Sequence, residues 1–177
     1  MAQTDYIMRI IEQFADFLWA IVLNKKAQNY DFALEKINEA YNGLLYLNAD
    51  KIKNLSANEI LENNTHKGSL DKNNIEIIAN LLFEEADILE NINGNNIVSF
   101  EYYQKSIELF IKLVNETAKT QYCENIEEIN TLLERKGAVT KNEIMGFYEI
   151  LLKRDDVDLE KGNLPRTEII EAIKALE

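Results

Sequence analysis

The hydrophobic residues of this chain recur every three or four positions over most of its length, a spacing that places side chains on one face of an α-helix. Short polar segments containing asparagine or glycine interrupt this pattern. The pattern therefore predicts an all-α chain with helices over about 5–26, 30–47, 56–61, 74–92, 97–120, 124–136, 140–154 and 166–176.

The first predicted helix, 5–26, is apolar around most of its circumference. Its polar side chains Arg9, Glu12 and Asp16 fall on one stripe, and most of the remaining positions are hydrophobic. A helix with so wide an apolar arc is expected to be covered on two sides. This favours a layered array of helices over a single helix on a surface.

Several helix ends carry their own sequence signals. Ser56 and Glu59 have the spacing of a capping box, in which each side chain accepts a hydrogen bond from the other residue's backbone N–H, and Thr140 with Glu143 repeats it. Gly94 stands where the helix 74–92 ends, and glycine readily adopts the positive φ that such ends require. These signals support the predicted boundaries.

One pattern of small and large residues occurs twice. In each copy a small residue is followed by a large one four positions later and by a second small one three positions after that. The first copy is Ala33, Ile37 and Ala40, and the second is Ser99, Tyr103 and Ser106. The three positions share one helix face, where small residues let a second helix approach closely. We therefore expect packed helical hairpins.

This pattern resembles the tetratricopeptide repeat. Tyr30 precedes the first copy as in that family, Gly94 lies at the second hairpin turn, and Gln28 stands where a glycine is usual in the first. The copies are offset by 99 − 33 = 66 residues, close to twice the family period of about 34. The resemblance implies a right-handed, TPR-like array of stacked antiparallel hairpins with a non-repeat connector.

The chain is expected to form one domain, because 177 residues suit a single core. Its expected parts are a first hairpin at 5–47, a connector with a short helix at 48–73, a second hairpin at 74–120 and C-terminal helices at 124–177. The opening segment 5–13 and the hairpin after it also resemble a family of small uncharacterised bacterial proteins with this kind of fold, which carries no established activity.

The chain is strongly acidic, with a formal net charge of −12. Binding to nucleic acids requires a basic surface, and anionic membranes repel acidic proteins. We therefore expect neither a nucleic-acid nor a membrane partner. The first residues lack the positively charged region of a signal peptide, which favours the cytoplasm, and the heavy use of Asn, Ile and Lys suits an AT-rich bacterial genome.

Residue types that support catalysis are few. The single histidine, His66, excludes sites built on paired histidines, and the single cysteine, Cys123, has only Lys119 within one helical turn to activate it. We expect His66 to be exposed and Cys123 to be a buried or half-buried thiol. Neither a glycine-rich phosphate loop nor a nucleophile elbow occurs. The chain is therefore not expected to be an enzyme or to hold a cofactor or metal.

Two acidic segments resemble metal sites in outline. Segment 84–87 contains three carboxylates, but the histidine that a metal site in a helical bundle needs is absent, so we expect a solvated face. Segment 156–160 alternates acidic and apolar residues, but Lys161 and Thr167 stand where a calcium loop requires glycine and glutamate. We expect a charged linker there.

The resemblance to the repeat family implies a concave groove lined by the first helix of each hairpin. Its predicted lining is Leu18, Val22, Lys25, Leu81, Glu84, Ile88 and Asn91. Apolar walls with a glutamate suit a protein or peptide partner that presents a basic or amphipathic helix. The alternative is that the connector or the C-terminal helices fill this groove as ordinary core.

We therefore expect a non-catalytic protein–protein interaction module that serves as an adaptor or regulator. Two alternatives remain open. The chain could be a structural homodimer that pairs through its apolar groove, or a sensor of small molecules or peptides with a pocket in the helical array. A dimer would show twice the monomer mass without a partner, whereas a sensor would gain thermal stability from its ligand.

Overall fold

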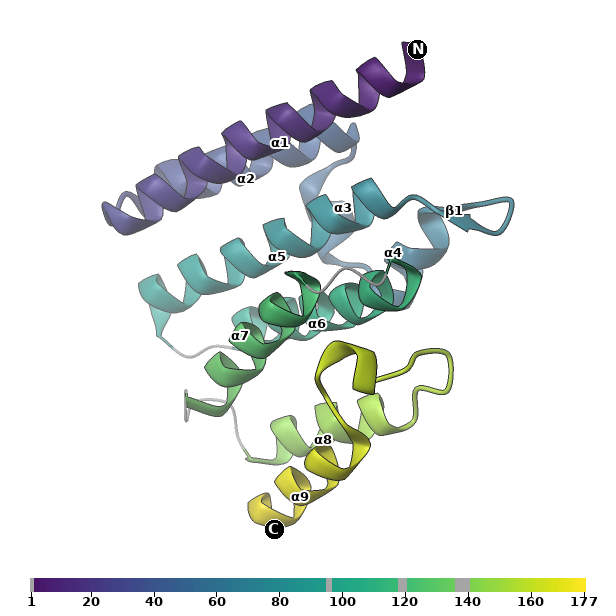
Figure 1. Ribbon diagram of the computed structural model, residues 1–177. Helices are drawn as coiled ribbons and strands as arrows, with labels where there is room; N and C mark the ends of the chain where they lie inside the picture. The colour runs from purple at the N-terminus through teal and green to yellow at the C-terminus, as the bar shows by residue number, and fades with distance from the viewer. Residues whose placement is uncertain (1, 95–96, 118–120, 136–140) are drawn as a thin grey trace.

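The computed structural model describes residues 2–94, 97–117, 121–135 and 141–177, and these residues are almost entirely helical (Figure 1). The elements are α1 Ala2–Lys26, α2 Tyr30–Leu45, α3 Ala49–Lys53, α4 Ala57–Asn63, β1 Thr65–His66, β2 Ser69–Leu70, α5 Lys72–Asn93, α6 Ile97–Thr117, α7 Gln121–Arg135, α8 Lys141–Leu152, the 3-10 helix η1 Glu160–Gly162 and α9 Arg166–Leu176. The expectation of an all-α chain is confirmed for the described residues.

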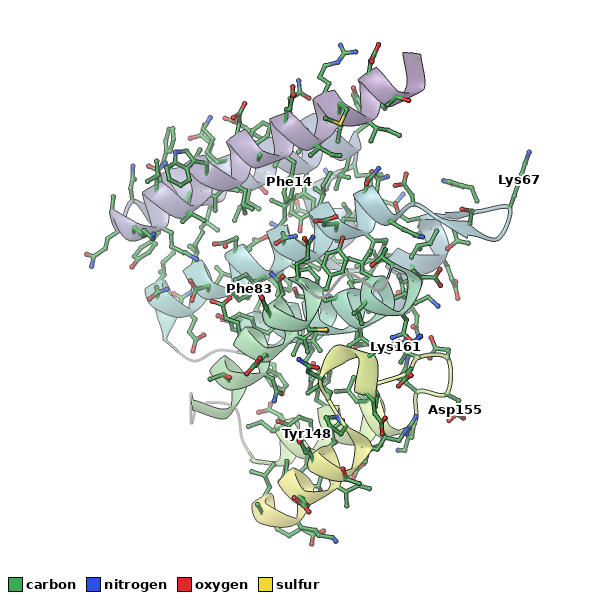
Figure 2. All side chains as sticks on the ribbon, viewed as in Figure 1. Phe14, Lys67, Phe83, Tyr148, Asp155 and Lys161 are labelled. Carbon is green, nitrogen blue, oxygen red and sulfur yellow. The ribbon has the colours of Figure 1, made fainter. Side chains whose placement is uncertain are left out.

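The long helices form a layered array in chain order. α1 packs on α2, α2 on α5, α5 on α6 and α6 on α7, while α8 packs on α9 at the far end. Figure 1 shows α1 and α5 on the near side, with α2 and α6 behind them. Phe14 lies on the side of α1 that faces the other helices and packs against the core (Figure 2).

The positions of the repeated small and large residues are all buried. Ala33, Ile37 and Ala40 are 0% exposed, and the corresponding residues of α6, Ser99, Tyr103 and Ser106, are at most 2% exposed. The Ser106 hydroxyl donates a hydrogen bond to the Ala79 carbonyl of α5 at 2.7 Å. A small side chain at position 106 thus lets α6 approach the backbone of α5.

The predicted helix-end signals are present where the structure describes them. The Ser56 N–H donates to the Glu59 carboxylate at 2.8 Å, and the Glu59 N–H donates to the Ser56 hydroxyl at 3.2 Å, so the capping box is confirmed. Gly94 ends α5 with φ of 65°. The second predicted box, at Thr140 and Glu143, includes a residue outside the described ranges.

The connector contains two elements that the hydrophobic pattern did not predict. α3 is five residues long, too short to show a helical period, and begins where the Asn48 side chain accepts a hydrogen bond from the Lys51 N–H. β1 and β2 pair as a small antiparallel hairpin. Its turn places Lys67 at φ 51° and Gly68 at φ 79°. The hairpin lies away from the helical layers (Figure 1).

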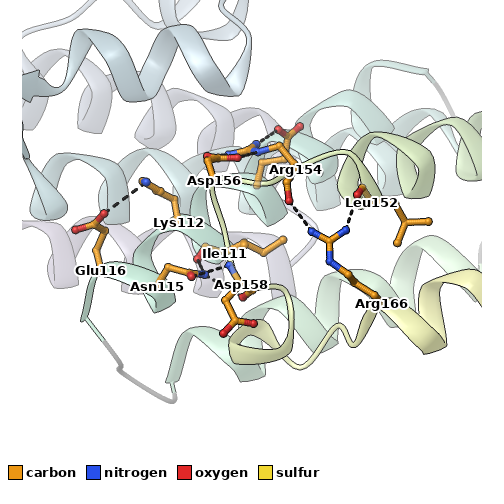
Figure 3. A network of polar contacts seen from close by, with 10 residues as sticks. Ile111, Lys112, Asn115, Glu116, Leu152, Arg154, Asp156, Asp158 and Arg166 are labelled. Carbon is orange, nitrogen blue, oxygen red and sulfur yellow. Dashed lines mark hydrogen bonds and ion pairs between the residues drawn. The ribbon is translucent and has the colours of Figure 1, made fainter.

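A polar network attaches the C-terminal helices to α6 (Figure 3). The Arg154 guanidinium contacts Glu108 of α6 at 2.8 Å and Asp156 at 2.7 Å. Arg166 at the start of α9 donates to the Arg154 carbonyl at 2.7 Å. Asn115 of α6 accepts from the Asp158 N–H at 2.8 Å. These bonds fix the segment between α8 and α9 against α6.

Candidate functional site

Helix α1 carries an exposed apolar face. We call it the α1 stripe and define it as Met8, Ile11, Ala15, Trp19 and Val22, which recur at helical spacing and fall on one face. Met8 is 52% exposed, Ile11 47% and Trp19 66%, Ala15 is exposed, and Val22 is half-buried at the edge. Leu23, beside the stripe, is 45% exposed.

The exposure of this face corrects the expectation that α1 is covered on two sides. α1 is the first helix of the array, and its principal contacts are with α2 and α5. Figure 2 shows side chains on its upper side pointing away from the other helices. The wide apolar arc in the sequence therefore reports one buried face, centred on the fully buried Ile21, and one face without a cover.

The residues of the predicted groove divide into two sets. Leu18, Val22 and Lys25 of α1 are half-buried, and Asn91 of α5 is exposed. The remaining three residues of the predicted groove lie inside the chain. Leu81 and Ile88 are 0% exposed and Glu84 is 7% exposed. A partner could therefore contact the α1 residues, but Leu81 and Ile88 belong to the protein's own core.

The acidic segment of α5 is not a solvated face, contrary to expectation. Lys25 of α1 approaches Glu84 at 2.6 Å and Asp87 at 2.8 Å, and Lys53 of α3 approaches Glu85 at 2.7 Å. Glu84 and Glu85 are 7% and 6% exposed. Adjacent positions on a helix point to different sides, so each glutamate meets a lysine from a different element.

Burial changes the acidity of these glutamates. Burial raises the pKa of the Glu84 carboxyl, and its attraction to Lys25 only partly opposes this. The pKa of Glu85 is likewise raised by burial, against the opposing effect of Lys53. A hydroxyl group near the same pairs, that of Tyr41, is buried without a hydrogen-bond partner. The two lysine–glutamate pairs hold α1 and α3 against α5.

The single histidine and the single cysteine lie where the sequence predicted, the first exposed and the second buried. His66 lies exposed in the β1–β2 hairpin. Cys123 of α7 is buried, and its thiol donates to the Lys161 carbonyl at 3.0 Å. Burial raises the pKa of this thiol, which disfavours the reactive thiolate.

The segment 156–160, with its calcium-loop-like spacing, is part of the packed structure. Its apolar members Val157 and Leu159 are buried, while Asp156 pairs with Arg154. Within the described ranges, no group of three or more histidine, cysteine, aspartate or glutamate side chains is arranged to hold a metal ion. The alternation of acidic and apolar residues in this segment therefore reflects the burial of every second side chain.

Several pockets on the described part of the chain could admit small molecules, and two of them concern this site and His66. One, of about 430 Å³, lies between α1 and α2 and is lined by Gln13, Asp16, Phe17, Ala20, Lys36, Gly43 and Leu44. Another, of about 280 Å³, lies under the connector, with His66 and Asn64 among its polar lining. The first pocket extends the accessible surface of α1 toward α2.

The α1 stripe was not identified as a surface from the sequence, although its signal is present. The intervals of three and four between Met8, Ile11, Ala15 and Trp19 are visible in the sequence, but they do not tell an exposed face from a buried one.

Among the described residues, every helix is too short or too polar to traverse a lipid bilayer.

A family model matches residues 1–87 and 68–177, and so spans the whole chain. No curated protein and no solved structure matches the chain significantly. The match agrees with the resemblance of the opening segment to a family without established activity. The chain belongs to a family of unknown function, DUF6483.

Proposed function

We propose that this protein is a non-catalytic protein–protein interaction module, an adaptor or regulator of the bacterial cytoplasm, that docks its partner on the α1 stripe. The observation that carries the proposal is the exposure of Met8, Ile11 and Trp19 on one face of a helix that the other described residues leave uncovered. Contiguous exposed apolar surface of this kind marks interaction sites in proteins that otherwise bury their hydrophobic residues.

Trp19 is the main anchor in this proposal. Tryptophan is enriched among the residues that dominate binding energy at interfaces, and burying a large apolar side chain contributes about 1.5–3 kcal/mol. Trp19 is the single tryptophan of the chain, and 66% of its surface faces solvent. A partner that covered Trp19 and Ile11 would therefore gain a large part of its affinity from two residues.

The geometry of the stripe favours an amphipathic helix as the partner. A straight row of side chains at helical spacing fits the apolar face of a second helix, which inserts its own side chains between those of the first. The half-buried Leu18 lies beside the stripe on the side toward α5, where Lys25 is paired with Glu84 and Asp87. The proposed site thus retains the α1 part of the predicted groove and omits the buried α5 part.

We further propose that the array is TPR-like. In its support, α1 with α2 and α5 with α6 each form a pair of neighbouring helices, and the small residues Ala33, Ala40, Ser99 and Ser106 are buried in both pairs. Arrays of this type expose the first or last layer unless a capping helix covers it. The uncovered face of α1 is what such an architecture leaves at one end.

The test is affinity capture with matched variants. Ile11→Glu places a charge in the stripe, and Ile150→Glu places the same charge on α8 at a residue of similar exposure, 51% against 47%. We expect the wild type and Ile150→Glu to retain a protein that Ile11→Glu loses. Equal retention by all three, or no retained protein of any kind, a native copy of this chain included, would contradict the proposal. Circular dichroism of the variants verifies that each is folded.

A further inference from the structure

We infer that the α1 stripe binds the α1 stripe of a second copy of this chain, with the two helices antiparallel. The inference deepens the proposed function and rests on it, because it takes the α1 stripe as the docking face and names the helix that occupies it. Two properties of α1 support it: the order of side chains along the stripe and the charges at its two ends. The length of the helix sets how strong the contact can be.

The stripe is symmetric about its centre. Ala15 is the middle residue, Ile11 and Trp19 lie four positions to either side, and Met8 and Val22 lie seven positions to either side. An antiparallel pair with its two-fold axis at Ala15 would place Ile11 against Trp19 of the second copy and Met8 against Val22. The small side chain at the axis would let the two backbones approach closely. This positional symmetry is what a pair of identical, antiparallel helices requires, whereas an unrelated partner helix does not require it.

The charges at the ends of α1 select the antiparallel direction. Asp5 lies in the first turn and Lys26 in the last, and both side chains are exposed. They stand 10 and 11 positions from Ala15, so an antiparallel pair would bring Asp5 of each copy to Lys26 of the other. A parallel pair would instead place like charges together at both ends. In the antiparallel pair, the positive N-terminal end of each helix dipole also lies beside the negative C-terminal end of the other, which is favourable.

The length of α1 sets the expected strength of the contact. A helix of 25 residues is about 37 Å long and, with its side chains, about 10 Å wide. Two such faces fall near or below the lower end of the area buried by specific protein interfaces. The net charge of −12 on each copy also opposes association. We therefore expect a reversible dimer that dissociates at micromolar concentrations.

The first experiment measures the mass of the full chain by analytical ultracentrifugation from low to high micromolar concentrations. We expect the mass to rise from 20.5 kDa toward twice that value. The emission of Trp19 should shift to shorter wavelength over the same range as its indole ring leaves water. Ile11→Glu should remain a monomer with unshifted emission, and Ile150→Glu should behave as the wild type. A wild-type monomer at every concentration, or dimerisation unaffected by Ile11→Glu, overturns the inference.

A charge exchange tests the direction of pairing. Asp5→Lys would put two lysines together at each end of an antiparallel pair and should weaken the dimer several-fold. Adding Lys26→Asp to it restores opposite charges and should recover most of the affinity. A double variant that dimerises no better than Asp5→Lys contradicts the antiparallel arrangement.

The failure of this inference is distinguishable from failure of the proposed function. If the chain stays monomeric while a different protein is captured in an Ile11-dependent manner, the second copy is the wrong occupant and the docking face stands. If the chain neither dimerises nor retains a partner through Ile11, both proposals are overturned.

Discussion

The Nζ atom of Lys25 lies 2.6 Å from Oε2 of Glu84, and this contact joins the last turn of α1 to the middle of α5. The same ammonium group reaches Asp87 at 2.8 Å and lies 5.8 Å from the centre of the Phe83 ring. Because Glu84 is otherwise surrounded by protein, Lys25 is the cation that compensates its burial. This pair therefore helps to hold the last turn of α1 on α5, while the rest of α1 packs mainly on α2.

We predict that Lys25→Met destabilises the protein by about 2 kcal/mol, because it leaves a buried carboxylate without its partner. The matched control is Lys36→Met, which removes an exposed pair with Glu39 one turn away on the same helix and should cost about 0.5 kcal/mol or less. Urea unfolding followed by circular dichroism measures the free energy of unfolding of each. Equal losses for the two variants would contradict a compensating role for Lys25.

The raised pKa values of the buried glutamates predict a pH dependence. A carboxyl with a higher pKa in the folded state than in the unfolded state binds its proton more tightly when folded. Stability therefore increases as the pH falls through the window between the raised pKa and the ordinary value of 4.5. Glu84, Glu85 and Glu108 all contribute in this direction, since burial is the largest cause of each shift.

The measurement is the urea midpoint between neutral pH and about pH 5, where we expect a rise for the wild type. Glu84→Gln should show a shallower rise, because it removes one of the three titrating groups. Asp156 has a lowered pKa owing to its hydrogen bond with Arg154, so its stabilisation is lost only below its ordinary value of 3.8, outside this window. A midpoint that falls between pH 7 and 5 would show that the glutamates are not buried as described.

Substitutions at Ser106 test the close approach of α6 to α5. Ser106→Leu should destabilise by about 3 kcal/mol, because a larger side chain at a fully buried site forces the helices apart. Ser106→Ala keeps the small volume and loses only the hydrogen bond to the Ala79 carbonyl, at a cost of about 1 kcal/mol. Denaturant unfolding of both variants gives the comparison. Similar losses for alanine and leucine would mean that the volume at this site is unrestricted.

Two glycines should respond in opposite ways to alanine. Gly43 lies inside α2, and a Cβ added there meets nothing within 4 Å, so Gly43→Ala should stabilise the protein by about 0.5–1 kcal/mol. Gly68 has φ of 79° in the β1–β2 turn, so Gly68→Ala should destabilise it by about 1 kcal/mol. Thermal unfolding of the two variants should show shifts of opposite sign.

Much of the fold could be predicted because its signals are local. The capping box of Ser56 and Glu59 lies within four residues. The small residues Ala33, Ala40 and Ser106 stand at helical spacing from the large residues near them, and this spacing predicts the close helix packing in which they are buried. α3 and the β1–β2 hairpin escaped prediction because five residues and two residues are too few to show a period. Their stability comes from side-chain caps and turn geometry.

The site could be predicted only in part, because exposure depends on how the layers are arranged. Leu81 and Val22 are both apolar residues on helices that begin a hairpin, yet Leu81 is fully buried and Val22 lies at an open edge. Glu84 and Glu85 read as solvated in the sequence because their partners Lys25 and Lys53 are 59 and 32 positions away. A local sequence pattern cannot identify a lysine that pairs with a buried glutamate from so far away along the chain.

The two chain termini lie at opposite ends of the molecule, with α1 at one end and α9 at the other (Figure 1). A protein attached to a sensor chip or bead through Glu177 would therefore present the α1 stripe outward, away from the support. Attachment through the N-terminus would crowd that same helix. The site chosen for immobilisation can thus decide whether a binding experiment detects an occupant of α1.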